Sequence, residues 1–306
     1  QFRADVPPPV PVGTEVAIRV LRAGICGTDA ALVDGMYQFA GIPGHEFVGV
    51  AIGGSDEIRD HRVVGEINIS CGVCPACVRG HRKHCARRKA LGVRNHHGAF
   101  AEFLVLPIEN LHLVPDSVPD DAAVFVEPIA AALDILDQVE VRPDQRVLVV
   151  GDGKLGQLVC RVVALSGASV DVAGRYPDKL RRLAGVAGNT YEHGTFERRG
   201  YDIAVECTGN PTGLSAAVDA LRPQGTLVIK STFFGPVEVD TSRIVVDELR
   251  VLGSRCGRFE AALALLDKGR VDPLPLIDGR FPLENALDGF RKSREPGVLK
   301  ILLDFD

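Results

Sequence analysis

The sequence predicts an α/β protein that combines a doubly wound parallel sheet with a second, strand-rich region. Two observations predict this fold class. From about residue 127 to 253, strand and helix patterns alternate, which is typical of a parallel sheet covered by helices. Before this stretch, residues 1–126 are rich in Gly, Pro and Val and contain short strand patterns such as Glu15–Leu21 and Phe100–Leu106.

The alternating stretch begins and ends with a strand pattern. The strand segments are short apolar runs, and the helix segments between them are longer. In chain order the segments are Arg146–Val150, Leu155–Leu165, Ser169–Ala173, Pro177–Ala187, Tyr201–Glu206, Gly213–Leu221 and Gly225–Ile229.

The tail from residue 254 contains a helix at Arg258–Lys268, a second helix around Leu283–Lys292 and a closing strand at Val298–Leu303. This tail is too short to form a core of its own, so we expect it to pack on the first stretch. A chain of 306 residues is long enough for two domains. We therefore predict one domain from residues 1–126 and 254–306 and a second from residues 127–253.

The composition excludes several classes of protein. A net charge of −5 and a pI near 5.9 argue against a nucleic-acid-binding face. No apolar run reaches the length of a membrane span and no signal-peptide pattern is present, so we expect a cytoplasmic protein. The sequence begins at Gln1, inside a proline-rich loop pattern, and we expect an N-terminal strand to be missing from it.

Four of the eight cysteines lie within residues 71–85, which we call the zinc lobe. In a cytoplasmic protein such a cluster indicates a metal site rather than a set of disulfides. Four thiolates complete a tetrahedral shell around Zn²⁺ and leave no position for a substrate, so a zinc ion here is structural. The predicted ligands are Cys71, Cys74, Cys77 and Cys85.

A second set of metal ligands is spread along the chain: Cys26, His45 and Glu127. One thiolate, one imidazole and one carboxylate form a workable catalytic zinc set with an open fourth position. Each residue alone is more often a packed cysteine, a hydrogen-bonded histidine or a solvated glutamate. Their occurrence together with the zinc lobe and a nucleotide motif favours a catalytic site.

The nucleotide motif follows the strand Val147–Val150. The loop that continues from this strand is followed by a helical pattern, and together they match the glycine-rich fingerprint of a Rossmann domain. Its glycines permit the tight turn, the approach of the pyrophosphate and close packing of helix on strand, while the helix N-terminus faces the phosphates. The loop residues are Gly151, Asp152, Gly153, Lys154, Leu155 and Gly156.

The end of the next strand bears on the choice of cofactor. An NAD site needs an acid about twenty residues past the glycines, where it binds the ribose hydroxyls. Here the strand ends in Gly174-Arg175, with Lys179 one turn further on, and Asp171 lies too early in the strand. Because Arg175 can grip a 2′-phosphate, we favour NADP(H) over NAD(H). An arginine at this place can also simply stack on the adenine, which leaves the preference open.

The order of these motifs resembles the medium-chain dehydrogenase/reductase family of zinc-dependent alcohol dehydrogenases. Within that family the chain is most similar to the polyol and threonine dehydrogenase-like branch, and the resemblance covers nearly the whole chain. It implies a GroES-like, β-rich catalytic domain with the zinc lobe at residues 71–85, together with the Rossmann domain. The motifs that carry the resemblance are Gly24–Asp29, Pro43–Gly49, the zinc lobe, Val126–Pro128 and the glycine-rich loop.

The resemblance also assigns roles at the open metal site. It implies that Cys26, His45 and Glu127 hold a catalytic zinc ion, and that Glu46 is a second carboxylate able to approach the metal directly or through water. Thr28 matches the hydroxyl that passes the substrate proton. The family often has a histidine three residues after this threonine to continue the proton relay, but that place holds Ala31 here. The proton must then leave through water or another group.

Further cofactor contacts follow from the same resemblance. Cys207 and Thr208 match a strand-end contact with the adenosine side, and the next strand, which should point toward the nicotinamide, ends in Lys230 and Ser231. Lys230 can equally extend to solvent. The pair Ser254 and Arg255 is a plausible wall of the cleft, where the chain returns to the first domain.

These observations predict a zinc-dependent oxidoreductase that transfers a hydride between an alcohol or carbonyl and a nicotinamide cofactor. Its partner is a small molecule, and Tyr37 and Phe39 indicate a partly apolar substrate. The resemblance implies a homodimer or homotetramer. Two alternatives remain: an NADPH-dependent reductase of an activated C=C or C=N bond without catalytic zinc, and a catalytically silent nucleotide-binding protein.

Overall fold

The computed structural model describes residues 2–35, 38–192, 195–233 and 235–305. The chain divides into two compact units. Unit 1 contains Gln1–Glu127 and Phe259–Asp306, and unit 2 contains Pro128–Arg258. Tyr37, which we expected near the substrate, lies outside the described residues.

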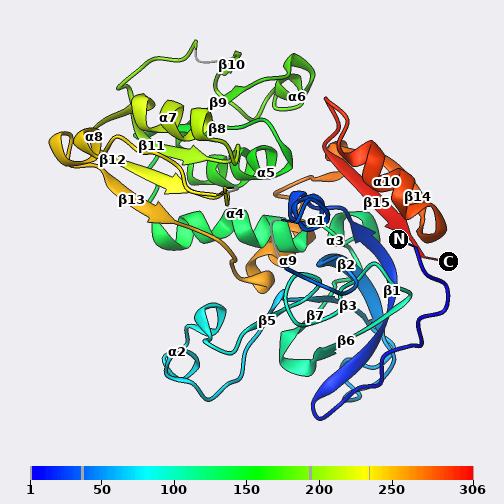
Figure 1. The fold of residues 1–306 in the computed structure, drawn as a ribbon. Coiled ribbons are helices and arrows are strands. Elements are labelled where there is room, and N and C mark those ends of the chain that lie inside the picture. Colours follow the sequence, from blue (N-terminus) through cyan, green and yellow to red (C-terminus); the bar gives the residue numbers. More distant parts are fainter. Residues whose placement is uncertain (1, 36–37, 193–194, 234, 306) are drawn as a thin grey trace. The chain divides into compact units, whose positions relative to one another are not determined.

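Unit 1 is built on a seven-stranded sheet in the order β14-β15-β1-β2-β3-β7, with β6 paired to β1. β1 and β15 come from opposite ends of the chain and run antiparallel side by side (Figure 1). This pairing is the physical reason why the tail packs on the first stretch. The strands are β1 (Glu15–Gly24), β2 (Glu46–Ala51), β3 (Arg62–Gly65), β6 (Phe103–Pro107), β7 (Leu111–Leu113), β14 (Ile277–Pro282) and β15 (Lys300–Asp304).

Short helices and a small lobe complete unit 1. α1 (Gly27–Val33) connects β1 to β2, and α10 (Ala286–Ser293) connects the parallel strands β14 and β15. The remaining helices of at least four residues are α2 (Pro75–Val78), α3 (Asp120–Ala123) and α9 (Phe259–Asp267), and the two-stranded sheet β4 (Asn68–Ile69) and β5 (Lys89–Ala90) flanks the zinc lobe. The largest group of core side chains on these strands includes Ile18, Phe47 and Leu106, and a second group gathers around Ile301 and Leu303 of β15.

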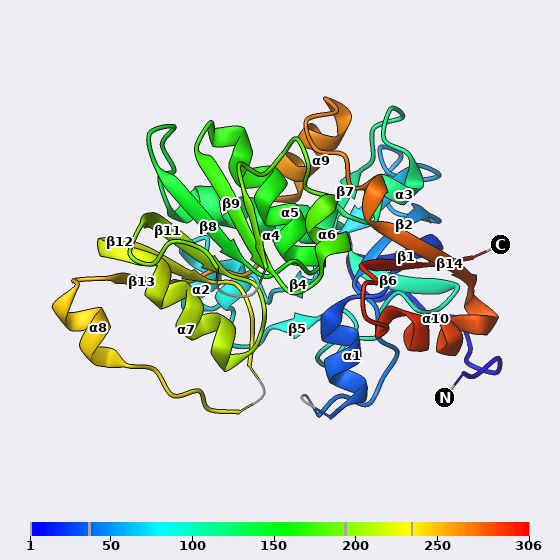
Figure 2. The ribbon, with the colours of Figure 1, turned by 90° about the horizontal axis from the view of Figure 1, so that it is seen from above.

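Unit 2 is a six-stranded parallel sheet in the order β10-β9-β8-β11-β12-β13. This order confirms the predicted doubly wound sheet, because the chain crosses outward in both directions from the central pair β8 and β11. Right-handed crossovers then place α5 and α7 on opposite faces of the sheet (Figure 2). The strands are β8 (Arg146–Val150), β9 (Ser169–Gly174), β10 (Thr190–Glu192), β11 (Tyr201–Glu206), β12 (Leu221–Ile229) and β13 (Arg250–Gly253).

The helices of unit 2 are α4 (Val126–Gln138), which begins at the boundary between the units, α5 (Lys154–Val163), α6 (Pro177–Arg181), α7 (Pro211–Ala220) and α8 (Thr241–Val246). The segment Pro177–Ala187, expected as one helix, is helical only to Arg181. Beyond it the backbone hydrogen bonds span three residues, except that Ala187 N–H donates to the carbonyl of Leu183 four residues earlier. Gly185, with φ of +79°, closes the turn.

Nothing in the described part of the chain forms a helix with both the length and the apolar character needed to cross a bilayer.

Candidate catalytic and nucleotide sites

The register between β1 and β2 brings the first group of candidate ligands together. Gly24, the last residue of β1, pairs with Glu46, the first residue of β2. Cys26 follows two residues after Gly24, and His45 precedes Glu46, so both side chains lie at this end of the strand pair. Ligand atoms of Cys26, His45 and Glu46 all lie within 4.8 Å of one another.

Asp29 holds this arrangement in place. Its carboxylate accepts hydrogen bonds from the backbone N–H of Cys26 at 2.8 Å and of Gly44 at 3.2 Å, and it is fully buried. Its Oδ1 also lies 3.4 Å from His45 Nδ1. A carboxylate on one ring nitrogen orients a histidine so that the other nitrogen can bind a metal. Asp29 was assigned no role from the sequence, although it lies three residues after the helix N-cap Cys26, at the place of the acid in a capping box.

Glu46 forms a buried ion pair with Lys300 of β15. Both residues are 1% exposed, and Lys300 Nζ contacts Glu46 Oε2. Burial lowers the pKa of Lys300, but the charges of Glu46 and Cys26 raise it more, so the pKa lies above its ordinary value. Lys300 therefore stays charged, and its Nζ also lies 5.3 Å from the centre of the Phe125 ring. We missed this lysine; a single lysine in an apolar closing strand was the available signal.

Gly24 makes room for this ion pair. A Cβ at Gly24 would lie 2.8 Å from Glu46 Oε2 and 2.8 Å from Val124 Cγ1. Contacts this short do not occur without a shift of the neighbours, so the position requires glycine.

Thr28 and Glu127 occupy different places relative to the donor group. Thr28 Oγ1 lies 3.8 Å from Cys26 Sγ, within the first turn of α1, so its hydroxyl borders the group. Glu127 lies in the first turn of α4 and is not among the residues whose ligand atoms are mutually close. The structure brings the carboxylate of Glu46 close to Cys26 and His45.

The donor set fits a zinc ion. A thiolate, an imidazole and a carboxylate are ligands that zinc prefers in open catalytic sites. Burial lowers the pKa of His45, whereas Asp29 and Cys26 raise it to a value well above the ordinary one. A metal that binds this ring therefore competes with a proton.

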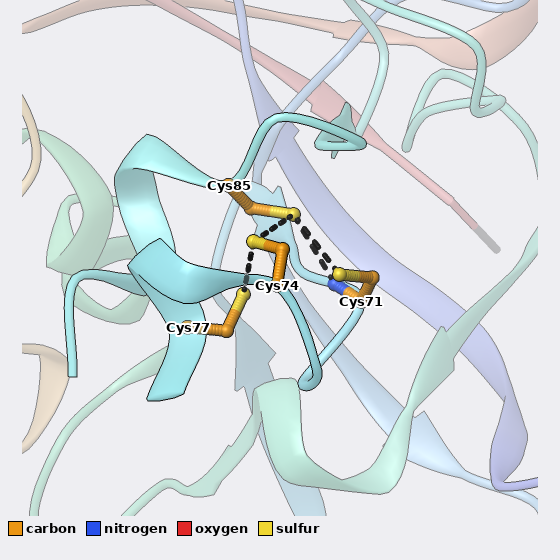
Figure 3. A group of neighbouring side chains, drawn as sticks. All are labelled: Cys71, Cys74, Cys77 and Cys85. Carbon is orange, nitrogen blue, oxygen red and sulfur yellow. Dashed lines mark hydrogen bonds between the residues drawn. The ribbon is translucent and has the colours of Figure 1, made fainter. Parts of the chain in front are cut away.

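The four cysteines of the zinc lobe form a compact cluster (Figure 3). Their sulfur atoms lie within 4.8 Å of one another, with Cys74 at 3.4 Å from Cys77 and 3.8 Å from Cys85, and Cys71 at 3.5 Å from Cys85. A tetrahedral shell with Zn–S bonds near 2.3 Å places its sulfurs about 3.8 Å apart. The cluster therefore matches a closed zinc site in both chemistry and spacing.

The electrostatics of the lobe favour the thiolate at Cys71 and Cys74, whereas burial raises the pKa of Cys77. Hydrogen bonds, the strongest from the backbone of Val73, lower the pKa of Cys71 to about 6, and Arg87 adds to this effect. Of the other basic residues in or just after the lobe, Arg82 lies 3.6 Å from Glu109, and Arg88 donates to the carbonyl of Lys83.

The glycine-rich loop has the geometry expected of a dinucleotide site. Gly151 has φ of +126°, and a Cβ at Gly156 would lie 1.9 Å from the Gly151 carbonyl oxygen. Gly153 is the N-cap of α5, which begins with Lys154 and Leu155, and a Cβ added at Gly153 would meet no described atom within 4 Å. This open approach to a helix N-terminus suits a pyrophosphate.

Asp152 connects this loop to the end of β9. Its Oδ2 accepts hydrogen bonds from the backbone N–H of Arg175 at 2.7 Å and of Tyr176 at 2.6 Å. The Arg175 side chain is exposed. Lys179 is buried, with its Nζ 4.7 Å from the centre of the Tyr176 ring. Of the two cations considered for a 2′-phosphate, the structure presents Arg175 to solvent and holds Lys179 against an aromatic ring.

Lys230 hydrogen-bonds within unit 2. Its Nζ donates to the carbonyl of Ala131 at 2.5 Å, to Ser254 Oγ at 3.1 Å and to the carbonyl of Arg255 at 3.0 Å. Ser254 Oγ in turn donates to the buried Asp134 at 2.9 Å. Lys230 and Ser254 thus connect α4 to the segment that follows β13.

The remaining cofactor candidates lie at the carboxyl ends of β11 and β12. Cys207 follows β11 and borders Gly151, and burial raises the pKa of its thiol. Thr208 donates to Glu206 Oε1 through its backbone N–H at 2.5 Å and its hydroxyl at 2.6 Å. Ser231 is half-buried, and a Cβ at Gly209 would lie 3.7 Å from its Cβ.

Three features occur together in this chain: a Rossmann sheet with a glycine-rich loop, a four-cysteine lobe and an open cysteine–histidine–glutamate group. Together they define a nicotinamide-dependent dehydrogenase of the zinc-using class. Comparison with known proteins agrees. Residues 13–116 match the alcohol dehydrogenase GroES-like domain, and residues 155–268 match the zinc-binding dehydrogenase domain. The chain belongs to the zinc-dependent medium-chain alcohol dehydrogenase family, which confirms the resemblance and makes it an oxidoreductase.

Individual relatives support this membership along the whole chain. L-threonine 3-dehydrogenase of Saccharopolyspora erythraea is 30% identical, and the match covers 98% of this chain and 94% of that protein. A zinc-binding dehydrogenase of Sinorhizobium meliloti solved with NADP has a TM-score of 0.90 and 28% identity, covering 98% of this chain and 94% of that one. An Escherichia coli alcohol dehydrogenase solved with NADH has a TM-score of 0.89 and 27% identity, covering 97% and 94%.

Proposed function

We propose that the protein interconverts a small alcohol and the matching carbonyl compound by hydride transfer, with a catalytic zinc ion at Cys26, His45 and Glu46. The observation that carries this proposal is the group of three mutually close donor atoms, all within 4.8 Å, at the end of β1 and β2. Glu127 is a further carboxylate that we propose for this site on the family resemblance. Zinc bound here supplies a Lewis acid that polarises the substrate oxygen, and the nicotinamide exchanges the hydride.

The residues of the chain orient these groups and handle the proton. Asp29 fixes the ring of His45, and Lys300 balances the charge of Glu46 inside a buried site. Thr28 accepts the proton of the substrate hydroxyl at Oγ1 in the oxidation direction and returns it in the reduction direction. Because Ala31 cannot continue a relay, Thr28 releases its own hydroxyl proton to water or to another group as it accepts the proton of the substrate.

We propose that the cofactor is NADP(H) in preference to NAD(H). Arg175 is exposed directly after β9, at the place where an acid would bind the ribose of NAD, and its guanidinium suits a 2′-phosphate. The relatives solved with bound cofactor include one with NADP and one with NADH, so family membership alone does not set the preference.

We propose further that the protein is a homo-oligomer that associates through β13. β13 is an edge strand of the unit 2 sheet, and Val251 within it is 41% exposed. Val245 and Val246 of the neighbouring α8 are more than 70% exposed. If β13 pairs with β13 of a second copy about a two-fold axis, the exposed edge of the sheet and these valines are covered. Size-exclusion chromatography with light scattering tests this proposal, and a monomeric mass contradicts it.

The experiment for the proposed function is a panel of alcohols and carbonyls assayed with NADPH and NADH in parallel, together with zinc analysis. The proposal expects turnover of at least one alcohol–carbonyl pair and about two zinc ions per chain. Turnover of activated C=C or C=N bonds with about one zinc ion per chain would instead favour the zinc-independent reductase. Absence of turnover across the panel would favour a catalytically silent nucleotide-binding protein.

A further inference from the structure

We propose that Asp152 acts as the ribose-reading acid of this chain and opposes Arg175, so that the preference for NADP(H) over NAD(H) is weaker than Arg175 alone would make it. This inference rests on the proposed function only in that unit 2 is taken to bind a nicotinamide dinucleotide. It concerns a residue inside the glycine-rich loop, which the family motif leaves free to vary between the first two glycines.

The strand that normally supplies the acid lacks one at its end. β9 ends at Gly174 and is followed by Arg175. Asp171, the acid within β9, is 1% exposed and already engaged, because it accepts hydrogen bonds from Tyr201 Oη at 2.8 Å and from the backbone N–H of Asn189 at 2.8 Å. A ribose at the carboxyl end of β9 therefore cannot use Asp171.

Asp152 brings a carboxylate to this end of the sheet from the neighbouring strand. β8 and β9 are parallel neighbours, so their carboxyl ends lie at the same edge. Asp152 follows β8 by two residues, and its Oδ2 sits 2.7 Å and 2.6 Å from the backbone nitrogens of Arg175 and Tyr176. These are the first two residues after β9, where this fold binds the adenosine ribose.

The position is built to hold the carboxylate. Asp152 is only 7% exposed. A Cβ at Gly174 would lie 2.5 Å from Asp152 Cβ and 2.6 Å from Asp152 Oδ2, so the glycine that ends β9 provides the space that Asp152 fills. Because Oδ2 accepts both backbone hydrogen bonds, Oδ1 is the oxygen left to accept a hydrogen bond from a ribose hydroxyl.

The consequence for a 2′-phosphate follows from charge. Backbone N–H groups at a strand end are donors that a phosphate can use, but those of Arg175 and Tyr176 already donate to Asp152. A 2′-phosphate would also meet the negative charge of that carboxylate, whereas Arg175 attracts it. Lys179 does not add a second exposed cation, because it is buried against Tyr176. Selectivity is therefore the difference between one attraction and one repulsion.

The test uses cofactor fragments, so it does not depend on zinc, substrate or hydride transfer. Isothermal titration calorimetry of the full chain measures the affinity for adenosine 2′,5′-bisphosphate and for 5′-AMP, and the ratio of the two reports selectivity for the 2′-phosphate. Asp152→Asn keeps an oxygen that accepts both backbone hydrogen bonds but removes the charge, and it should raise this ratio about tenfold. Arg175→Gln should lower it by a similar factor, and the double variant should return it to within about threefold of the parent.

The control variant is Asp144→Asn, which removes an equal charge from an exposed loop before β8, at the opposite end of the strand. It should leave the ratio within about twofold of the parent, since exposed charges beyond a Debye length are screened. If Asp152→Asn does not fold, as judged by circular dichroism, Asp152→Ser provides the same comparison with a small hydrogen-bond acceptor.

An unchanged or lower ratio in the folded Asp152 variant overturns this inference while leaving the proposed function intact. A tenfold rise in the Asp144→Asn control would overturn it as well, because the effect would then come from net charge. If neither the parent nor any variant binds either nucleotide, unit 2 is not a dinucleotide site. The proposed function then fails together with this inference.

Discussion

The buried pair of Glu46 and Lys300 gives a prediction whose size can be worked from the structure. Both side chains are almost completely buried, so replacing Lys300 by Met leaves a carboxylate without its counter-charge in the interior. Removing one partner of a buried ion pair costs about 3–5 kcal/mol. For a unit of this size, such a loss lowers the melting temperature by about 10 °C.

The assay is urea and thermal unfolding of the metal-depleted protein, with the parent and Lys300→Met compared at pH 7. The pKa of Lys300 is raised in the folded state, so its charged form stabilises the folded protein. This contribution to the free energy of unfolding is fully present below the pKa of an unfolded lysine, about 10.4, and is lost as the pH rises through the higher folded value. The difference between parent and variant should therefore be constant from pH 6 to pH 9 and shrink above about pH 10.4.

Two further variants make this prediction specific. Lys292 is an exposed lysine paired with Glu295 on the surface, so Lys292→Met should cost less than about 1 kcal/mol. Combining Lys300→Met with Glu46→Gln should cost less than the sum of the two single changes, because no unpaired buried charge remains. A loss below about 1 kcal/mol for Lys300→Met would refute the argument that this pair is a buried charge pair.

The remaining predictions concern the residues around the two metal-binding groups. Gly24→Ala should destabilise the protein by about 1–3 kcal/mol in urea unfolding and reduce zinc retention, because the added Cβ would overlap Glu46 and Val124. Zinc retention equal to that of the parent would contradict this. Asp29→Ala should weaken zinc affinity about 10- to 100-fold in a chelator competition, since His45 would lose its orienting partner; unchanged affinity would assign Asp29 to helix capping alone. In metal-stripped protein, the rate of alkylation of Cys71 should rise with pH, with a midpoint near pH 6, the value to which its pKa is lowered. Peptide mass spectrometry follows the alkylation, and a midpoint above pH 8 would contradict the prediction.

Local patterns predicted the nucleotide unit well, because its sheet is built from short-range βα units. Arg146–Val150 and Tyr201–Glu206 are strands with the expected bounds, and the parallel order of the sheet follows from the crossover rule. The helix expected at Pro177–Ala187 was too long. Its last residues form tight turns stabilised by tertiary packing of Leu183, which a helical hydrophobic period cannot distinguish from α-helix.

The catalytic group was predicted only in part, because its geometry depends on pairings distant in the chain. Cys26 and His45 stood beside glycines in recognisable motifs, and the structure brings their ligand atoms together. Lys300 could not be linked to Glu46 from the sequence, since 254 residues separate them and the contact exists only through the pairing of β1 with β15 and β2. Asp152 was assigned no role of its own from the sequence for a similar reason: its partners are backbone groups at the end of another strand.

The central claim is that Cys26, His45 and a carboxylate hold a catalytic zinc ion distinct from the one in the zinc lobe. Zinc analysis by mass spectrometry of the parent and of Cys26→Ser, each purified in parallel, tests it most directly. The account predicts about two zinc ions per chain in the parent, about one in Cys26→Ser, and loss of alcohol and carbonyl turnover in that variant alone. A parent with about one zinc ion per chain that Cys26→Ser retains in full would contradict it.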